Sequence, residues 1–159
     1  MRLDEEKVRN AVRLLLEGLG IENEEVLSNT PDRVVRFYKD FMNNTNNISM
    51  FDETVDAVEF TNIRFYSLCE HHILPFFGHV NIRYKPNGQV IGLSKVVRIV
   101  DMCSRKLTLQ ERMTKEIATK LHEYLRCEVE VEVIAQHMCM MMRGVKNKAS
   151  VKTYYKISK

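Results

Sequence analysis

The sequence predicts an α+β protein, because helical and strand-like hydrophobic patterns occupy different parts of the chain. Apolar residues recur every three or four positions over residues 8–19, the spacing of an amphipathic helix. The pattern becomes strand-like over residues 55–68 and again over residues 77–84. Helical spacing returns after residue 94 and after residue 108. We therefore expect N-terminal helices followed by an antiparallel sheet with two helices packed on it.

The composition suits a single folding unit. Its 159 residues and 45% hydrophobic content are enough for one core, within which we distinguish an N-terminal helical segment, residues 1–45, from residues 46–159. No apolar run approaches the length of a bilayer span, and the acidic, amphipathic start of the chain is unlike a signal peptide. We therefore expect a cytoplasmic protein without a membrane partner. A net charge of +3 requires no nucleic-acid partner, so none is predicted, and it does not exclude an anionic small molecule.

The N-terminal segment is expected to form two helices. Thr30 and Pro31 suggest the N-cap and the first position of the second helix. Arg33 and Arg36 lie three positions apart on this helix, where a solvated face is the favoured interpretation. Residues 43–54 lack periodicity and are expected to form a loop between the helices and the sheet.

A first group of potential metal ligands lies where the strand pattern breaks. Cys69 and His72 have the C-x-x-H spacing of one arm of a zinc site. On an extended strand their side chains would point to opposite faces, so both reach one ion only if the chain bends. The alternative for this segment is a buried cysteine beside partly solvated imidazoles. Residues 86–88, Pro-Asn-Gly, are expected to make a hairpin turn after the second strand.

Two helix starts follow, each with a structural and a functional interpretation. Ser94 is placed to cap a helix with Lys95 and Arg98 near its start, which suggests either a phosphate cradle or an ordinary cap with exposed cations. Residues 108–111 match a T-x-x-E capping box, so Glu111 is either a capping residue or available for another role.

A second group of potential ligands follows a strand with one wet side. Val129, Val131 and Val133 alternate with glutamates, and this strand runs into His137-Met138-Cys139. If the strand stays extended, His137 and Cys139 share a face and both could point into one pocket. Four cysteines at irregular spacing fit free thiols or metal ligands better than a disulfide framework. A last strand is expected over residues 149–157.

Taken together, five motifs in order resemble the GTP cyclohydrolase I family, whose members are zinc enzymes that open the guanine ring of GTP. The motifs are Thr30-Pro31-x-Arg33, Ser67-Leu68-Cys69-Glu70-His71-His72, Ile91-Gly92-Leu93-Ser94-Lys95 with Arg98, Gln110-Glu111-Arg112, and His137-Met138-Cys139 with Arg143-Gly144.

The resemblance implies a role for each matched residue. Cys69, His72 and Cys139 would hold zinc (Zn2+), with the fourth position left for water, and His71 and His137 would transfer protons. Glu111 would read the guanine, with Gln110 also at the substrate. The triphosphate contacts would be Ser94, Lys95, Arg98, Arg143, Arg33 and Arg36, where Arg36 replaces a lysine of the family. The resemblance also implies that residues 46–159 form a tunnelling-fold catalytic domain in a toroidal homodecamer, whose pockets lie between subunits.

The chain departs from the family pattern after residue 145, where a further helix is expected and the sequence instead ends at Lys159. Two other functions are compatible with parts of this sequence. One is a binding protein with structural zinc that holds a purine nucleotide without turnover. The other is a tunnelling-fold relative with a different substrate, such as a nitrile reductase with a cysteine nucleophile. The full ligand set together with His71 and His137 favours the GTP hydrolase.

Overall fold

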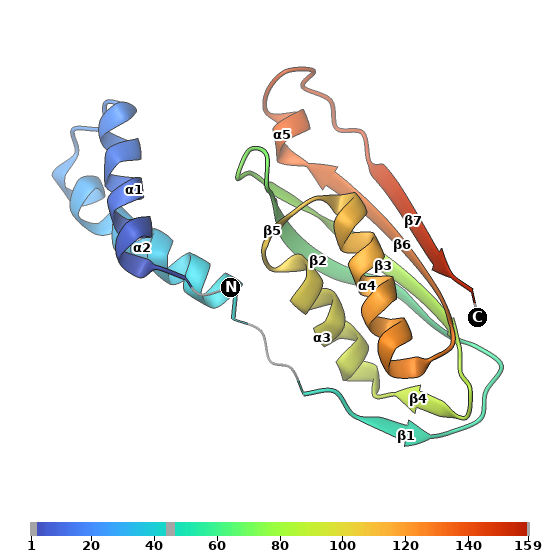
Figure 1. Ribbon diagram of the computed structural model, residues 1–159. Coiled ribbons are helices and arrows are strands. Elements are labelled where there is room, and N and C mark those ends of the chain that lie inside the picture. Colours follow the sequence, from blue (N-terminus) through green and yellow to red (C-terminus); the bar gives the residue numbers. More distant parts are fainter. Residues whose placement is uncertain (1–2, 44–46, 159) are drawn as a thin grey trace. The chain divides into compact units, whose positions relative to one another are not determined.

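The computed structural model describes residues 3–43 and 47–158, and it has the α+β architecture that the sequence predicts. Its contacts divide the chain into two compact units, Met1–Asn43 and Asn44–Lys159. The first unit is helical, and the second contains the sheet with the remaining helices (Figure 1).

The helical unit is a pair of amphipathic helices, α1 (Glu5–Gly18) and α2 (Glu24–Phe41). Two ion pairs join them: Arg9 Nε lies 2.7 Å from Asp32 Oδ1, and Lys39 Nζ lies 2.8 Å from Glu5 Oε1. These contacts are solvent-exposed, so each contributes little to stability compared with the apolar stripe between the helices.

The predicted start of the second helix at Thr30 is wrong. The cap is Asn23, whose side chain accepts a hydrogen bond from the Val26 amide at 3.2 Å, and Pro31 lies buried inside α2. Asn is among the strongest N-cap residues, and Glu24 and Glu25 place negative charge in the first turn. These signals start the helix upstream, and the proline is accommodated within it.

The segment predicted as a loop contains a short strand, β1 (Met50–Asp52), while residues 44–46 of that segment lie outside the described residues. β1 pairs in an antiparallel manner with β4 (Gln89–Ile91) in a separate two-stranded sheet. The predicted hairpin at residues 86–88 is therefore wrong: the chain turns there, but β4 leaves the preceding strand and pairs with β1.

The main sheet has the strand order β5-β2-β3-β6-β7. Its strands are β2 (Val58–Cys69), β3 (Pro75–Lys85), β5 (Leu107–Thr108), β6 (Glu128–His137) and β7 (Val151–Ile157). All neighbours are antiparallel except β5, which runs parallel to the end of β2. The predicted strands and the break after Cys69 are confirmed.

Helices α3 (Leu93–Ser104) and α4 (Gln110–Leu125) pack on one face of this sheet (Figure 1). The core between them is apolar and includes Met113, Ile117, Leu121 and Leu125 of α4 together with alternate residues of β6. On α3, Val96 and Ile99 are buried while Val97 is 40% exposed.

Neither predicted side-chain cap forms. The N-caps of α3 and α4 are Gly92 and Leu109, and the described residues supply no side-chain hydrogen bond to either. Ser94 therefore lies within the first turn of α3. Thr108 belongs to β5, because its pairing with Cys69 extends the sheet to that residue.

The opposite face of the sheet is polar. Glu128, Glu130 and Glu132 project from β6 and pair with lysines of the neighbouring strands, among them Lys156 and Lys152. Any side chain is excluded at Gly78 of β3, where an added Cβ would clash with the Ile134 carbonyl oxygen. Among the described helices, none is both long enough and apolar enough to cross a membrane.

Candidate metal centre

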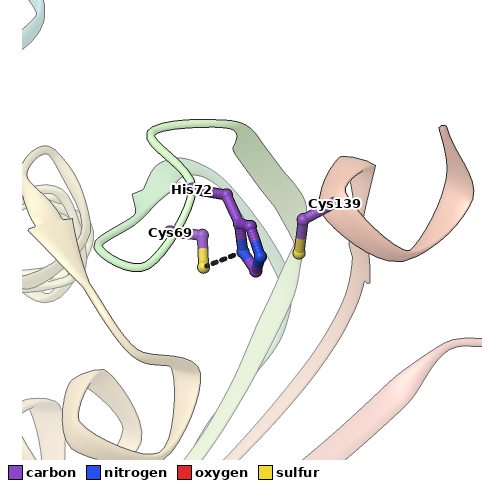
Figure 2. A group of neighbouring side chains, drawn as sticks. All are labelled: Cys69, His72 and Cys139. Atoms are coloured by element: carbon purple, nitrogen blue, oxygen red, sulfur yellow. Dashed lines mark hydrogen bonds between the residues drawn. The ribbon is translucent and has the colours of Figure 1, made fainter. Parts of the chain in front are cut away.

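The strand register brings two sequence-distant segments to the same edge of the sheet. β3 begins at Pro75, which pairs with Leu68 near the end of β2, while its next residue, Phe76, pairs with His137 at the end of β6. The chain that leaves β2 and the chain that leaves β6 therefore emerge on either side of the start of β3. The side chains of Cys69, His72 and Cys139 meet there (Figure 2).

The connection between β2 and β3 is a tight bend. The Ile73 amide donates to the Cys69 carbonyl oxygen at 2.8 Å, and the Cys69 amide donates to the Leu74 carbonyl oxygen at 2.9 Å. Ile73 has a φ of 56°, which is unfavourable for a β-branched residue. The bend reverses the chain within a few residues, and it turns His72 back toward Cys69. This is the departure from an extended strand that a shared ion requires.

The ligand atoms have the spacing and chemistry of a zinc site. One atom from each residue lies within 4.8 Å of the others, and Cys69 Sγ lies 3.8 Å from His72 Nδ1. Tetrahedral zinc with ordinary Zn–S and Zn–N bonds separates its ligand atoms by roughly 3.5–3.8 Å. If the three ligand atoms moved about 1 Å closer together, they would have the spacing of three ligands of a tetrahedral zinc ion, and the fourth ligand position would be free, as in catalytic zinc sites.

The protonation chemistry of the sulfurs also suits a cation. Burial raises the pKa of the Cys139 thiol, and the neighbouring Cys69 sulfur raises it further, while Arg143 acts in the opposite direction. Two thiolates at this spacing repel each other unless a positive charge lies between them. A divalent ion supplies that charge, so the residues present fit a zinc ion.

His72 is engaged through both ring nitrogens. Arg143 Nη1 donates to His72 Nε2 at 2.7 Å, because a guanidinium has no acceptor, and His72 Nδ1 faces Cys69 Sγ. A metal ion that takes one ring nitrogen replaces the contact that this nitrogen makes here. Arg143, one of the predicted triphosphate residues, thus lies at the edge of the metal cluster.

Cys139 reaches the cluster by a route that differs from the prediction. β6 ends at His137, and the chain becomes helical at α5 (Met138–Met141), so His137 and Cys139 are not successive same-face residues of an extended strand. The helical turn directs Cys139 toward Cys69 and His72 (Figure 2). A three-residue motif shows no periodicity, which explains why its backbone could not be predicted.

The start of α4 adjoins the same cluster. β5 pairs Thr108 with Cys69, and the Glu70 amide donates to the Thr108 carbonyl oxygen at 3.2 Å. Two residues later α4 begins with Gln110 and the exposed Glu111. Glu111 is close enough that its charge raises the pKa of His137, although desolvation is the larger effect and the net pKa of His137 is lowered.

An ion pair that the sequence analysis did not assign joins α4 to the bend. Arg112 donates to both carboxylate oxygens of Glu70, at 2.6 and 3.1 Å, and this contact holds the pKa of Glu70 below its ordinary value. Glu70 lies next to Cys69 in the chain, so the pair links the segment that bears two predicted ligands to the helix that bears Glu111. Both residues belong to the motifs, but sequence gives no distance between them.

The ring of His137 is half-buried and contacts two neighbouring side chains. Its ring stacks on Phe76, with centroids 4.7 Å apart and an interplanar angle of 1°, and its Nε2 lies 2.7 Å from Gln110 Oε1. Gln110 is only 2% exposed. His71, in contrast, is exposed in the bend beside His72.

The remaining predicted site residues belong to α3 and to the helical unit. α3 ends at Ser104, near the cluster, because Lys106 bonds through its carbonyl oxygen to Ser67 and Leu68 of β2. Ser94 and Lys95 lie in the first turn of α3, about 15 and 14 Å along the helix axis from Ser104, whereas Arg98 lies near the middle of the helix, about 9 Å from Ser104. Arg33 and Arg36 belong to the helical unit, where Arg33 pairs with Glu25 at 2.6 Å.

Fold and site together define an α+β protein with a candidate three-ligand zinc site. The family model of GTP cyclohydrolase I matches residues 8–158. The chain belongs to the GTP cyclohydrolase I family.

Relatives of known name are similar over most of their length. GTP cyclohydrolase 1 from Hyperthermus butylicus is 47% identical over 154 residues, which cover 94% of this chain and 80% of that protein. GTP cyclohydrolase 1 from Finegoldia magna is 48% identical over 153 residues, which cover 91% of this chain and 83% of that protein. A solved structure titled archaeosine synthase QueF-Like in the apo form aligns with a TM-score of 0.47 at 17% identity, covering 64% of this chain and 95% of that chain. A score of this size supports no conclusion.

Proposed function

We propose that this protein catalyses the zinc-dependent hydrolytic opening of the guanine imidazole ring of GTP, giving 7,8-dihydroneopterin triphosphate and formate. The observation that supports this most directly is the convergence of Cys69, His72 and Cys139 within 4.8 Å, beside Glu111 and His137, in a chain of this family. The product serves pterin and folate, or deazaguanine, synthesis in this proposal.

The metal ligands are Cys69, His72 and Cys139 in this proposal. A zinc ion bound there supplies Lewis-acid activation of a water molecule, which brings its pKa toward about 7. The protein's own contribution is to bring together the two sulfurs and one nitrogen from the end of β2, the bend that follows it and α5.

His71 and His137 are the proton-transfer residues, acting at the guanine ring nitrogen and at the ribose oxygen. A neutral imidazole both accepts and donates a proton near neutral pH. The lowered pKa of the half-buried His137 keeps its ring neutral at such a pH, which supports a role as acceptor. His71 is exposed on the bend, where a substrate over the metal cluster can reach it.

Glu111 reads the guanine. Its carboxylate is exposed at the first turn of α4, and it offers acceptors for the two donors of guanine, the N1–H and the exocyclic amine. Its competing role as a capping residue receives no support, since the N-cap of α4 is Leu109. Gln110, which the resemblance also places at the substrate, is 2% exposed, and its Oε1 lies 2.7 Å from His137 Nε2.

The triphosphate is held by Arg143 of one chain together with Ser94, Lys95, Arg98, Arg33 and Arg36. Ser94 and Lys95 lie at the start of α3, about 15 and 14 Å along the helix axis from Ser104, so both are far from a guanine at the cluster of their own chain, while Arg98 lies about 9 Å from Ser104. A second copy solves this, since its α3 terminus can lie over the first copy's cluster. We therefore propose a toroidal homodecamer of the tunnelling fold, in which residues 46–159 form the catalytic domain and residues 1–45 the helical segment.

Incubation of the zinc-loaded protein with GTP tests the proposal. Formate release together with a fluorescent pterin after oxidation is expected. Tight binding of GTP without formate would instead indicate a binding protein with structural zinc, and the absence of both outcomes would overturn the proposal. Size-exclusion chromatography with light scattering measures the oligomer in the same sample.

A further inference from the structure

Gln110 is a buried polar residue whose amide is fully engaged by protein groups. Its Nε2 lies 3.1 Å from the Val133 carbonyl oxygen, 3.0 Å from the Val151 carbonyl oxygen and 3.1 Å from Thr153 Oγ1. Its Oε1 lies 2.7 Å from His137 Nε2. α4 is thereby joined to β6 and β7 at the point where β6 reaches the metal cluster.

These partners fix which way the amide faces. The two backbone carbonyl oxygens only accept hydrogen bonds, so the atom that faces them has to be the NH2 group of Gln110. The reversed amide would place Oε1 against two carbonyl oxygens in a buried site, and each repulsive, unsatisfied contact there is costly. Oε1 therefore faces His137.

The neighbouring hydroxyls support the same orientation. Thr114 Oγ1 donates to the Gln110 carbonyl oxygen at 2.7 Å, which uses its only hydrogen. The contact of 2.6 Å between Thr114 and Thr153 then has Thr153 as its donor. Thr153 Oγ1 has no hydrogen left for Gln110, so it accepts from Nε2. The donor and the acceptor of each hydrogen bond in this network therefore follow from the backbone carbonyl groups, which only accept.

We propose that Gln110 is a positioning residue, which holds the His137 imidazole with its hydrogen on Nε2 and so reserves the lone pair of Nδ1 for the substrate. Because Oε1 only accepts, the hydrogen in the 2.7 Å contact belongs to His137. The parallel stack on Phe76 fixes the plane of the ring, so the two contacts together set its orientation. This inference rests on the proposed function, in which His137 transfers a proton.

The tautomer itself is measurable without turnover. In the zinc-loaded protein with 15N-labelled histidine, solid-state NMR at pH 8 separates protonated from unprotonated ring nitrogens, and a His137→Asn sample identifies the signals of His137. We expect Nε2 to carry the hydrogen and Nδ1 to be bare. A hydrogen on Nδ1, or on both nitrogens, overturns the proposal whether or not the protein hydrolyses GTP.

The variant Gln110→Met keeps the side-chain length and removes every hydrogen bond of the amide. We expect a mixture of both His137 tautomers, a kcat lower by about tenfold or more, and a KM for GTP within about twofold of the parent. If Gln110 contacts the substrate directly, KM rises instead and the tautomer stays single, which would contradict the positioning role.

A matched control is Gln89→Met, which removes an exposed glutamine whose Nε2 donates to Asp52 at 2.9 Å in the small sheet. Neither the NMR signals of His137 nor kcat should change in this variant. If Gln110→Met fails to fold, the spectrum of the parent protein still decides the tautomer. If the protein releases no formate from GTP, the proposed function fails while the tautomer result stands.

Discussion

The two ends of helix α3 differ in what they contribute to the candidate site. Near its C-terminal end, the bend after β2, the start of α4 and the end of β6 bring together three potential metal ligands, Glu111 and His137. Its N-terminal half bears Ser94, Lys95 and Arg98, and the helix begins two residues after β4 of the small sheet. One end of the domain thus has groups suited to ring opening, and the other has groups suited to an anion. In the proposed function, the reaction site is complete only when these two ends meet from different chains.

The largest expected effect is the loss of a metal ligand. Cys139→Ala leaves only two of the three donor atoms, so we expect zinc to be lost and formate release from GTP to fall by at least about 1,000-fold. Zinc content is measured by atomic absorption beside the activity. Cys103→Ala is the control, because Cys103 lies wholly buried in the core, where burial raises its pKa to about 12, and zinc should remain. Full zinc content in Cys139→Ala would contradict the ligand assignment.

Mixing subunits tests whether two chains share a site. Arg98→Ala should raise the KM for GTP by about tenfold or more while zinc content is unchanged, because in the proposed site its guanidinium contacts the triphosphate and not the metal. In mixed oligomers of Cys139→Ala chains and Lys95→Ala/Arg98→Ala chains, an intact metal cluster from one variant meets an intact α3 from the other. With equal amounts of both chains this occurs at about one quarter of the interfaces of a symmetric ring. We expect a corresponding recovery of activity. Mixed oligomers as inactive as either parent would show that each chain supplies its own anion contacts.

A substitution at Gly78 tests how strongly the metal cluster depends on the spacing between β3 and β6. A methyl group at Gly78 would meet the Ile134 carbonyl oxygen, so β3 and β6 have to separate near Phe76 and His137. We expect Gly78→Ala to lower the free energy of unfolding by about 2–4 kcal/mol and to weaken zinc binding. Urea unfolding and zinc titration measure the two effects. Gly18→Ala is the control, since nothing lies within 4 Å of its added Cβ, and it should not destabilise the protein.

The smallest expected effect lies on the polar face of the sheet, toward the end of β6 that is remote from the metal cluster. Lys156 pairs with Glu128 and Glu130 and holds the pKa of both carboxyl groups below the ordinary 4.5. A lowered folded-state pKa contributes stability above about pH 4.5, and this contribution is lost as the pH falls through the folded-state pKa. In Lys156→Met the loss of stability between pH 6 and pH 3 should therefore be smaller, by an amount that solvent screening keeps modest.

Urea midpoints at several pH values measure this change, with Lys148→Met as the control at an exposed lysine near the start of β7. Zinc content should be unaffected in both variants. An unchanged pH dependence in Lys156→Met would mean that the ion pairs do not form in solution.

The hydrophobic periodicity of the sequence predicted most of the secondary structure. The wrong predictions occur where several local signals compete. The strands and the apolar stripe of α4 were predictable because burial of one face imposes a period on the sequence. The caps at Thr30, Ser94 and Thr108 were wrong, since a capping signal contributes only about 1 kcal/mol and stronger neighbours or sheet pairing override it. The strand β1 escaped detection because three residues are too few to show alternation.

The sequence by itself determined the kinds of atoms in the site: two cysteine sulfurs, histidine nitrogens and a carboxylate, in motifs that mark the family. Tertiary structure alone decided that β3 separates β2 from β6 by one strand, so that Cys69 and Cys139, seventy positions apart, meet at one edge. It also decided that Gln110 is buried against His137, and that Lys95 and Arg98 lie in the N-terminal half of α3. Ligand type is a property of single residues, whereas distance depends on strand register and helix direction, which long-range packing sets.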